Sequence, residues 1–203
     1  MPVTRFILIR HGETEWNAVN REMGQLDSPL TAQGLSQAER LADRLAGVRF
    51  DALYSSDLGR AAQTAQAIAR KCACEIVYDV RLRERHMGIF QGLTPAESEV
   101  RFPRERAAYH QKDANYVIPQ GESAEQRLQR TVACLEELAR RHAGKTVVII
   151  THGGILLGFF EHVLGIPHGA GARFRRPNAA WNVFVQDERG WALETWGDVS
   201  HLA

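Results

Sequence analysis

Short apolar runs alternate along the chain with stretches in which apolar residues recur every three or four positions. The runs predict short strands at 4–10, 51–54, 75–78 and 146–150. The last of these, Thr146-Val-Val-Ile-Ile150, has the β-branched composition of a strand covered on both faces. Two later runs, 181–187 and 191–196, flank Asp187-Glu-Arg-Gly190 and predict a hairpin.

Helical spacing fills the intervals between these runs. A stripe of Leu35, Ala38, Leu41, Ala42 and Leu45 predicts a helix over 32–46 that begins after Thr31. Ser56 or Asp57 is expected to cap a second helix that ends near Lys71. A third helix is expected behind the capping-box spacing of Ser123-Ala-Glu-Gln126, with Leu128, Val132, Leu135 and Leu138 as its apolar stripe and Gly144 as its stop. Another helix follows 146–150.

This alternation predicts an α/β fold, a three-layer α/β/α sandwich around a mainly parallel sheet with an antiparallel edge strand. Residues 85–120 interrupt the pattern, because they contain Pro95, Pro103 and Pro119, mixed charge and no clear period. We expect them to form a small helical cap or lid insertion. A chain of 203 residues is long enough for one buried core, so residues 1–203 are expected to be a single domain.

Composition and charge narrow the class of protein. A formal net charge of +1 with 24% charged residues gives no reason to expect a nucleic acid or a membrane as partner. The apolar stretch 155–166 is broken by Glu161 and His162, and the N-terminus lacks the pattern of a signal peptide. Three cysteines without a second ligand pair indicate neither a disulfide framework nor a metal site. We therefore expect a cytoplasmic protein that binds no metal or other cofactor.

Two predicted strands end in similar residues. Arg10-His11-Gly12 follows the first strand, and His152-Gly153-Gly154 follows the strand at 146–150. If both strands are central and parallel, the two loops open at one edge of the sheet, where open α/β proteins bind ligands. A pocket of histidine and arginine without HExxH, a nucleophile elbow or a phosphate-binding glycine loop indicates an anionic substrate, and phosphate suits the guanidinium fork.

Four motifs in this order resemble the histidine phosphatase superfamily, in its phosphoglycerate-mutase-like branch. They are RHGETEWN at 10–17, Leu58-Gly59-Arg60-Ala61 with Thr64, Leu82-Arg83-Glu84, and Thr151-His152-Gly153. The resemblance spans essentially the whole chain. Asp27-Ser-Pro-Leu-Thr31 and Gly197-Asp-Val-Ser-His201 are similar to segments of the bacterial broad-specificity phosphatases and mutase-like-B members.

The resemblance implies a role for each matching residue. His11 would be the nucleophile that forms a phosphohistidine, and Glu84 would protonate the leaving oxygen and later take a proton from water. Arg10, Arg60 and His152 would surround the transferring phosphoryl group. The substrate-binding residues would be Arg10, Asn17, Gly24, Arg60, Glu84 and Gly153. From the residues alone, Arg60 could equally be a solvated helix residue and Glu84 an ordinary surface charge.

Departures from the family pattern favour hydrolysis over mutase activity. Met23 stands where many relatives have a glutamine, and 84–92 lacks the tyrosine and the lysine of the cofactor-dependent mutases. Residues 98–120 are shorter than the lid with which those mutases exclude water. We expect a metal-independent phosphatase for small phosphate monoesters. The alternatives are a phosphoglycerate mutase and a protein that binds phosphate ligands without turnover.

Two groups of basic residues have no assigned role. Arg101, Arg104, Arg106 and Lys112 lie in the cap and could contact a second anionic group, or they could form a solvated helix face. Arg173, Arg175 and Arg176 form the densest basic cluster, which could select acidic substrates, lie in a surface loop or contact another subunit. The late hairpin could also pair in a homodimer.

Overall fold

The computed structural model describes residues 2–203, which form a six-stranded sheet in the order β3-β2-β4-β1-β5-β6. The strands are β1 (Thr4–Arg10), β2 (Ala52–Ser55), β3 (Ile76–Tyr78), β4 (Thr146–Thr151), β5 (Trp181–Asp187) and β6 (Gly190–Asp198). The first four in this order are parallel, and β5 and β6 add an antiparallel hairpin beside β1. The predicted fold class is confirmed.

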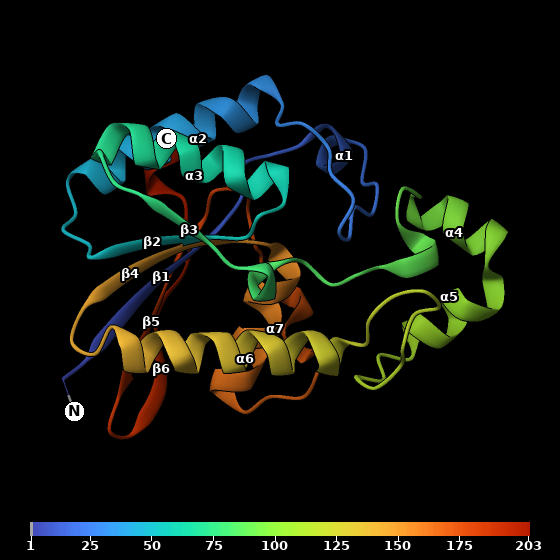
Figure 1. The fold of residues 1–203 in the computed structure, drawn as a ribbon. Coiled ribbons are helices and arrows are strands. Elements are labelled where there is room, and N and C mark those ends of the chain that lie inside the picture. The colour runs from blue at the N-terminus through green and yellow to red at the C-terminus, as the bar shows by residue number, and fades with distance from the viewer. Residues whose placement is uncertain (1) are drawn as a thin grey trace.

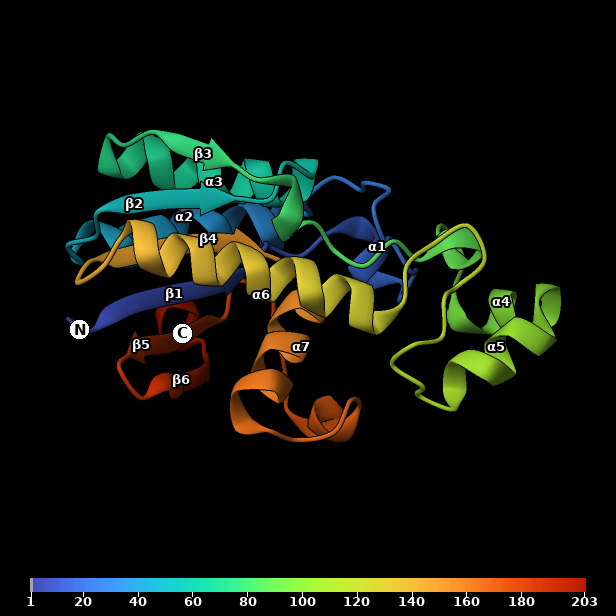
Figure 2. The same ribbon diagram turned by 60° about the horizontal axis from the view of Figure 1, so that its bottom comes forward.

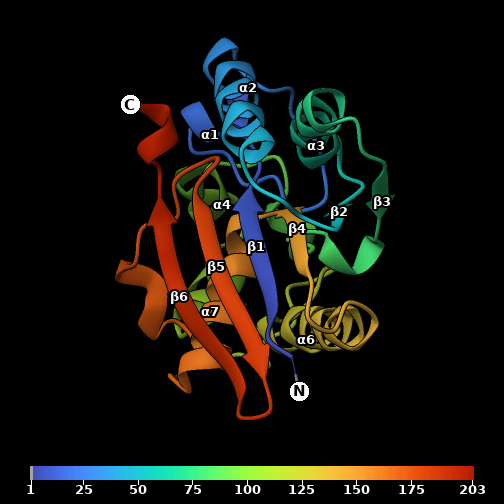
Figure 3. The same cartoon turned by 90° about the vertical axis from the view of Figure 1, so that its left-hand side faces the viewer.

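Helices cover both faces of the sheet (Figures 1 and 3). The helices are α1 (Glu15–Ala18), α2 (Ala32–Ala46), α3 (Gly59–Cys72), α4 (Pro95–Arg101), α5 (Pro103–His110), α6 (Ala124–Arg141) and α7 (Gly153–Leu164). Short 3-10 turns form η1 (Val80–Leu82), η2 (Gly88–Phe90), η3 (Ala170–Arg173) and η4 (Ser200–Leu202). Helices α2 and α3 pack on one face, and α6 and α7 on the other. None of the helices within 2–203 is long and apolar enough to cross a bilayer.

Alternating side chains of β1 supply a separate apolar core on each face. Ile7 and Ile9 pack with α2 and α3, whereas Phe6 and Leu8 pack with α6 and α7. Because a slip of one residue would exchange these faces, the pattern fixes how β1 pairs with β4. That pairing sets Arg10 opposite Thr151 and brings the ends of both strands to the same edge.

Three local predictions about helices were wrong. Helix α3 begins at Gly59 after Leu58, not behind a Ser56 or Asp57 cap, because the Asp57 carboxylate binds the Arg83 guanidinium at 2.7 Å and 2.5 Å. Leu35 is 53% exposed and does not belong to the buried stripe of α2. Helix α6 ends at Arg141 with His142 as its C-cap, three residues before Gly144, the predicted stop, which has φ +77° in the following turn.

Residues 85–120 lie beyond the edge of the sheet where β1 and β4 end (Figures 1 and 2). They contain η2, α4 and α5 and have an apolar cluster of their own, centred on Met87, Phe90 and Ile118. The buried Arg106 joins this cap to the N-terminal loop, since its guanidinium binds the Glu22 carboxylate at 3.0 Å and lies over the Phe90 ring. The cap thus forms one wall of the space above the strand ends.

Candidate active site

His11 and His152 lie side by side at the ends of β1 and β4. Their ring centroids are 5.2 Å apart, and both side chains are buried. The parallel pairing of the two strands, which extends to Arg10 and Thr151, produces this proximity. The structure therefore brings together the two loops that the sequence placed at one edge of the sheet.

The contacts of the His11 ring favour one neutral tautomer. Its Nδ1 atom lies 2.7 Å from the carbonyl oxygen of Gly12. A carbonyl only accepts, so Nδ1 carries the proton and Nε2 keeps a free lone pair. Burial, with the nearby charges of Arg60 and Arg10, lowers the pKa of His11 well below 6.5. Gly12 is required here, because a Cβ would lie 2.5 Å from the carbonyl oxygen of Gly34.

His152 is completely enclosed beside His11. Its Nε2 atom lies 2.8 Å from the hydroxyl oxygen of Ser56, which also accepts the Leu58 N–H at 3.3 Å. Its Nδ1 atom has no partner within residues 2–203. Burial, with the charges of Arg60 and other neighbours, lowers the pKa of His152 well below 6.5. An unpaired buried ring nitrogen is costly unless a ligand pairs with it.

Arg10 and Arg60 are held by protein carbonyls, and each keeps a buried Nε–H donor unused. Arg10 donates from Nη1 to the carbonyl of Arg176 at 2.6 Å. Arg60, which is 1% exposed, donates to the carbonyls of Leu26 at 2.8 Å and Gly24 at 2.7 Å. In both side chains the Nε–H is buried without a partner inside 2–203. Burial lowers the pKa of Arg10 to about 10, so the group stays charged at neutral pH.

Asp27 positions Arg60 at the start of α3. Its carboxylate lies 3.0 Å from the Arg60 guanidinium and accepts the backbone N–H groups of Gly59 and Arg60. It therefore takes the place of the missing side-chain cap of α3. The sequence had marked 27–31 only as a family-like segment, since the contact spans 33 positions along the chain.

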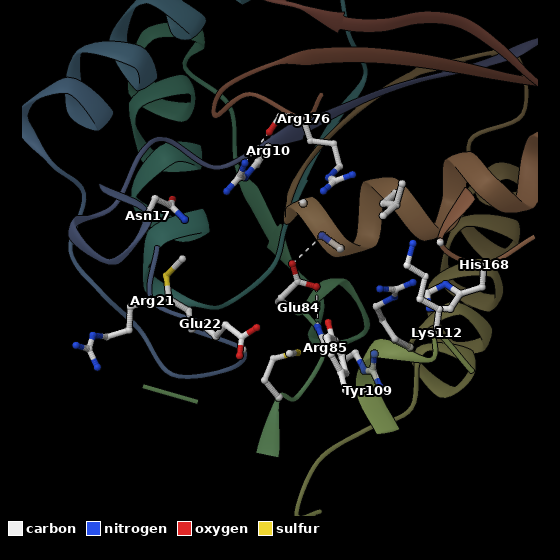
Figure 4. A pocket seen from close by; sticks show the side chains of 18 of the residues that line it. Arg10, Asn17, Arg21, Glu22, Glu84, Arg85, Tyr109, Lys112, His168 and Arg176 are labelled. Atoms are coloured by element: carbon white, nitrogen blue, oxygen red, sulfur yellow. Dashed lines mark hydrogen bonds between the residues drawn. The ribbon is translucent and has the colours of Figure 1, made fainter. Parts of the chain in front are cut away.

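Glu84 is fixed by two backbone N–H groups at the mouth of the site. Oε2 accepts from Gly154 at 2.8 Å, and Oε1 accepts from Arg85 at 2.8 Å. Arg130 supports the backbone, since its guanidinium donates to the Glu84 carbonyl at 3.0 Å. Figure 4 shows the carboxylate in the middle of the pocket, with Arg10 on one side and Arg85 on the other. Glu84 is thus not a free surface charge.

The remaining predicted residues are Asn17, Gly24 and Gly153. Asn17 offers a hydrogen-bond donor, and at the two glycines the backbone lies close to an arginine of the site. The Oδ1 atom of Asn17 accepts from Thr14 at 3.2 Å and from Asn178 at 3.1 Å, which leaves its amide NH2 available to the pocket. Gly24 has φ +56° and holds Arg60 through its carbonyl. Gly153 lies at the start of α7, where a Cβ would touch the Arg10 guanidinium at 3.4 Å.

These groups line a pocket of about 420 Å3 between the strand ends, the cap and the loop after α7. It is strongly cationic, and its wall includes four residues to which the sequence prediction gave no role: Arg21, Arg85, Arg127 and His168. Of the basic cluster considered for selecting acidic substrates, Arg176 lines the pocket. Lys112 lines it too, whereas Arg101, Arg104, Arg173 and Arg175 are exposed outside it. No sequence signal marked Arg127, because an arginine on an amphipathic helix is typical of a solvated face.

The side chains around His11 and His152 do not form a typical set of metal ligands. Among the described residues, no three His, Cys, Asp or Glu side chains form a group that could hold an ion. The donors around His11 are instead N–H groups, which suit an oxyanion.

Comparison with known proteins agrees with this geometry. Residues 6–199 match the family model of the histidine phosphatase superfamily, branch 1. The chain is 40% identical to the "Metal-independent phosphoserine phosphatase" of Arabidopsis thaliana over 204 residues, which are 99% of this chain and 84% of that protein. It is also 40% identical to the "Probable phosphoglycerate mutase GpmB" of Serratia proteamaculans, over 96% of this chain and 93% of that protein.

A solved structure extends the agreement to three dimensions. Bacillus stearothermophilus YhfR superimposes with a TM-score of 0.92 at 33% identity, over 98% of this chain and all of that one. The strand order, the pair of histidines and the matched residues lead to one conclusion: the chain belongs to branch 1 of the histidine phosphatase superfamily.

Proposed function

We propose that the protein hydrolyses small phosphate monoesters without a metal ion, through a phosphohistidine on His11. One observation carries the proposal. Three buried nitrogens around His11 have no partner within 2–203: the Nε atoms of Arg10 and Arg60, and Nδ1 of His152. An arginine Nε can only donate, so both arginine positions require an acceptor, and His152 Nδ1 can donate to the same group when it carries the proton. The equatorial oxygens of a transferring phosphoryl group provide several acceptors at once.

The first half of the reaction uses the lone pair of His11. Nε2 attacks phosphorus, the phosphorus–oxygen bond to the alcohol breaks, and Glu84 gives its proton to the departing oxygen. The Gly12 carbonyl accepts from Nδ1–H throughout and stabilises the positive charge that develops on the ring. Arg10, Arg60 and Asn17 donate to the phosphoryl oxygens.

The second half returns the protein to its starting state. Glu84, now ionised, takes a proton from water, and the hydroxide oxygen bonds to phosphorus as the phosphorus–nitrogen bond breaks. Inorganic phosphate leaves, and Nε2 regains its lone pair. The backbone N–H groups of Gly154 and Arg85 keep the carboxylate in place for both proton transfers.

Phosphate release separates the proposal from mutase activity. The assay uses p-nitrophenyl phosphate and 3-phosphoglycerate with a chelator, in the presence and absence of 2,3-bisphosphoglycerate. We expect phosphate release that neither the chelator nor the bisphosphate alters. Fast isomerisation that depends on the bisphosphate, with little phosphate release, would establish the mutase instead.

A variant pair tests the covalent step. His11→Ala should abolish turnover and the acid-labile label left by a radioactive substrate. His162→Ala, which removes an exposed histidine on the outer part of α7, is the matched control. Undiminished hydrolysis by His11→Ala would refute the mechanism.

The cellular setting is a further part of the proposal. A cytoplasmic protein acting on a small phosphorylated metabolite is supported by Cys72, Cys74 and Cys134, all of which are free thiols. A homodimer stays a prediction, which sedimentation would test.

A further inference from the structure

Arg127 is a buried arginine without a partner. Its side chain extends from the first turn of α6 and is 5% exposed, and its Nε is enclosed. No side chain or carbonyl within residues 2–203 forms a hydrogen bond or ion pair with its guanidinium. By contrast, the buried Arg60 and Arg106 bind the carboxylates of Asp27 and Glu22. A buried cation lacking such compensation is destabilising, and it therefore indicates a missing anion.

The guanidinium belongs to the wall of the candidate active site. It packs on α7 at Gly158, where a Cβ would lie 2.3 Å from one of its nitrogens. The Glu84 carboxylate packs on the same helix at Gly154, where a Cβ would lie 2.3 Å from Oε1. Residues 154 and 158 are one turn apart, so the two positions against which these groups pack are separated by about 6 Å along the helix axis. Arg127 thus lies one turn beyond the proposed proton donor, on the side away from Gly153 and Arg10.

Lys112 supplies a second positive charge to the same part of the pocket. Figure 4 shows Lys112 beside His168, on the opposite side of Glu84 from Asn17. The aliphatic part of the Lys112 side chain lies against Gly169, where an added Cβ would be 2.8 Å from Lys112 Cδ. The Lys112 ammonium group makes no ion pair with the described residues. The nearby Glu161 is committed elsewhere, because it accepts the backbone N–H groups of Gly169 at 2.8 Å and Gly171 at 3.0 Å.

We propose that Arg127 and Lys112 bind a carboxylate of the substrate, so that the preferred substrates are phosphorylated carboxylic acids. This inference rests on the proposed phosphatase function. With phosphorus at His11 and the ester oxygen at Glu84, a carboxylate one or two carbons further along would face Arg127. A guanidinium presents two parallel N–H donors to both oxygens of a carboxylate, and Lys112 adds charge from the cap.

The test compares substrates that differ by one group. O-phosphoserine and O-phosphoethanolamine differ in the carboxylate, as do 3-phosphoglycerate and glycerol 3-phosphate. Wild type should prefer the carboxylated member of each pair. Arg127→Met keeps the volume and removes the charge, and we expect its kcat/KM on carboxylated substrates to fall by about 30- to 100-fold, as for loss of a charge-assisted hydrogen bond. Its loss on p-nitrophenyl phosphate should be at least about tenfold smaller, because that substrate has no carboxylate.

Controls separate selectivity from folding. Arg127→Lys should restore part of the preference, and Arg104→Met, which alters an exposed arginine outside the pocket, should leave it unchanged. The melting temperature of Arg127→Met should equal or exceed that of wild type, since no internal partner is left unpaired. Equal losses of Arg127→Met on both members of a pair, or a wild type without preference, would overturn the inference.

Equilibrium binding makes the outcome independent of turnover. In a His11→Ala background, calorimetry should show tighter binding of 3-phosphoglycerate than of glycerol 3-phosphate, and Arg127→Met should remove the difference. If wild type does not hydrolyse p-nitrophenyl phosphate, the proposed function fails, while this binding difference still tests Arg127. Equal binding of both ligands would contradict the carboxylate site.

Discussion

Replacing Asp27 by alanine should damage catalysis from outside the pocket. The Asp27 carboxylate accepts two backbone N–H groups at the start of α3 and one bond from the Arg60 guanidinium. Loss of a helix cap costs about 1 kcal/mol, and the contact with Arg60 adds less than a fully buried pair, because the Asp27 side chain is 41% exposed. We expect a total loss of about 1 to 2 kcal/mol in the free energy of unfolding, which lowers the melting temperature by about 2 to 8 °C.

The effect on turnover should exceed the effect on stability. Arg60 would keep its bonds to the carbonyls of Leu26 and Gly24, so it stays in the pocket but loses the group that fixes its orientation. Because Arg60 is proposed to stabilise the transferring phosphoryl group, kcat should fall by about tenfold or more while KM changes less.

Steady-state kinetics and thermal unfolding measure both quantities. Asp43→Ala is the matched control, since Asp43 forms an exposed ion pair with Lys71 at 2.6 Å and contacts no pocket residue. Asp27→Asn should lie between wild type and Asp27→Ala, because the amide oxygen still accepts. If Asp27→Ala and Asp43→Ala have the same kcat and melting temperature, the positioning of Arg60 by Asp27 is refuted.

Three further predictions concern protons and space in the pocket. Glu84→Gln should slow the first half-reaction, measured as single-turnover release of the alcohol, by about 100-fold or more for alkyl phosphates but much less for p-nitrophenyl phosphate, because p-nitrophenolate leaves without a proton; equal losses in this step would contradict the role of Glu84 as proton donor. Burial lowers the pKa values of His11 and His152 well below 6.5, so the unfolded chain takes up protons first as pH falls below that value. In urea unfolding, these two groups should therefore lower the free energy of unfolding by up to about 2.7 kcal/mol for each pH unit below 6.5. His152→Asn should make this dependence on pH less steep, and an unchanged slope would show that His152 is not buried in its neutral form. Gly158→Ala should displace the Arg127 guanidinium and reduce the preference for carboxylated substrates, while Gly165→Ala, at the exposed end of α7 but with φ +63°, should lower stability without changing that preference.

The sequence predicted what depends on local pattern. The apolar runs of β1 and β4, and the residues at which these strands end, were enough to predict that His11 and His152 would meet. Glu84 could be assigned only by resemblance, because one of the two bonds that fix it comes from Gly154, 70 positions away. The N-terminal cap of α3 was missed for the same reason, since Asp27 reaches it from a distant loop.

Arg127 shows a different limit of sequence reasoning. An arginine in the first turn of an amphipathic helix usually faces water, and nothing nearby in the sequence indicates otherwise. Its burial results from packing between α6, α7 and the cap, and Gly158 provides the room. Only the three-dimensional contacts distinguish it from Arg130, which lies one turn later and binds Glu122 at 2.7 Å.

The glycines of α7 have a consequence for how this protein could change. Gly153, Gly154 and Gly158 let Arg10, Glu84 and Arg127 lie directly on the helix backbone, in that order. Under the proposed mechanism, bond breaking and substrate choice therefore occupy successive turns of one helix. A mutation at 127 or 158 can alter which compounds are accepted while the turn that holds Glu84 stays intact. New substrate ranges are thus reachable by single substitutions that do not pass through an inactive protein.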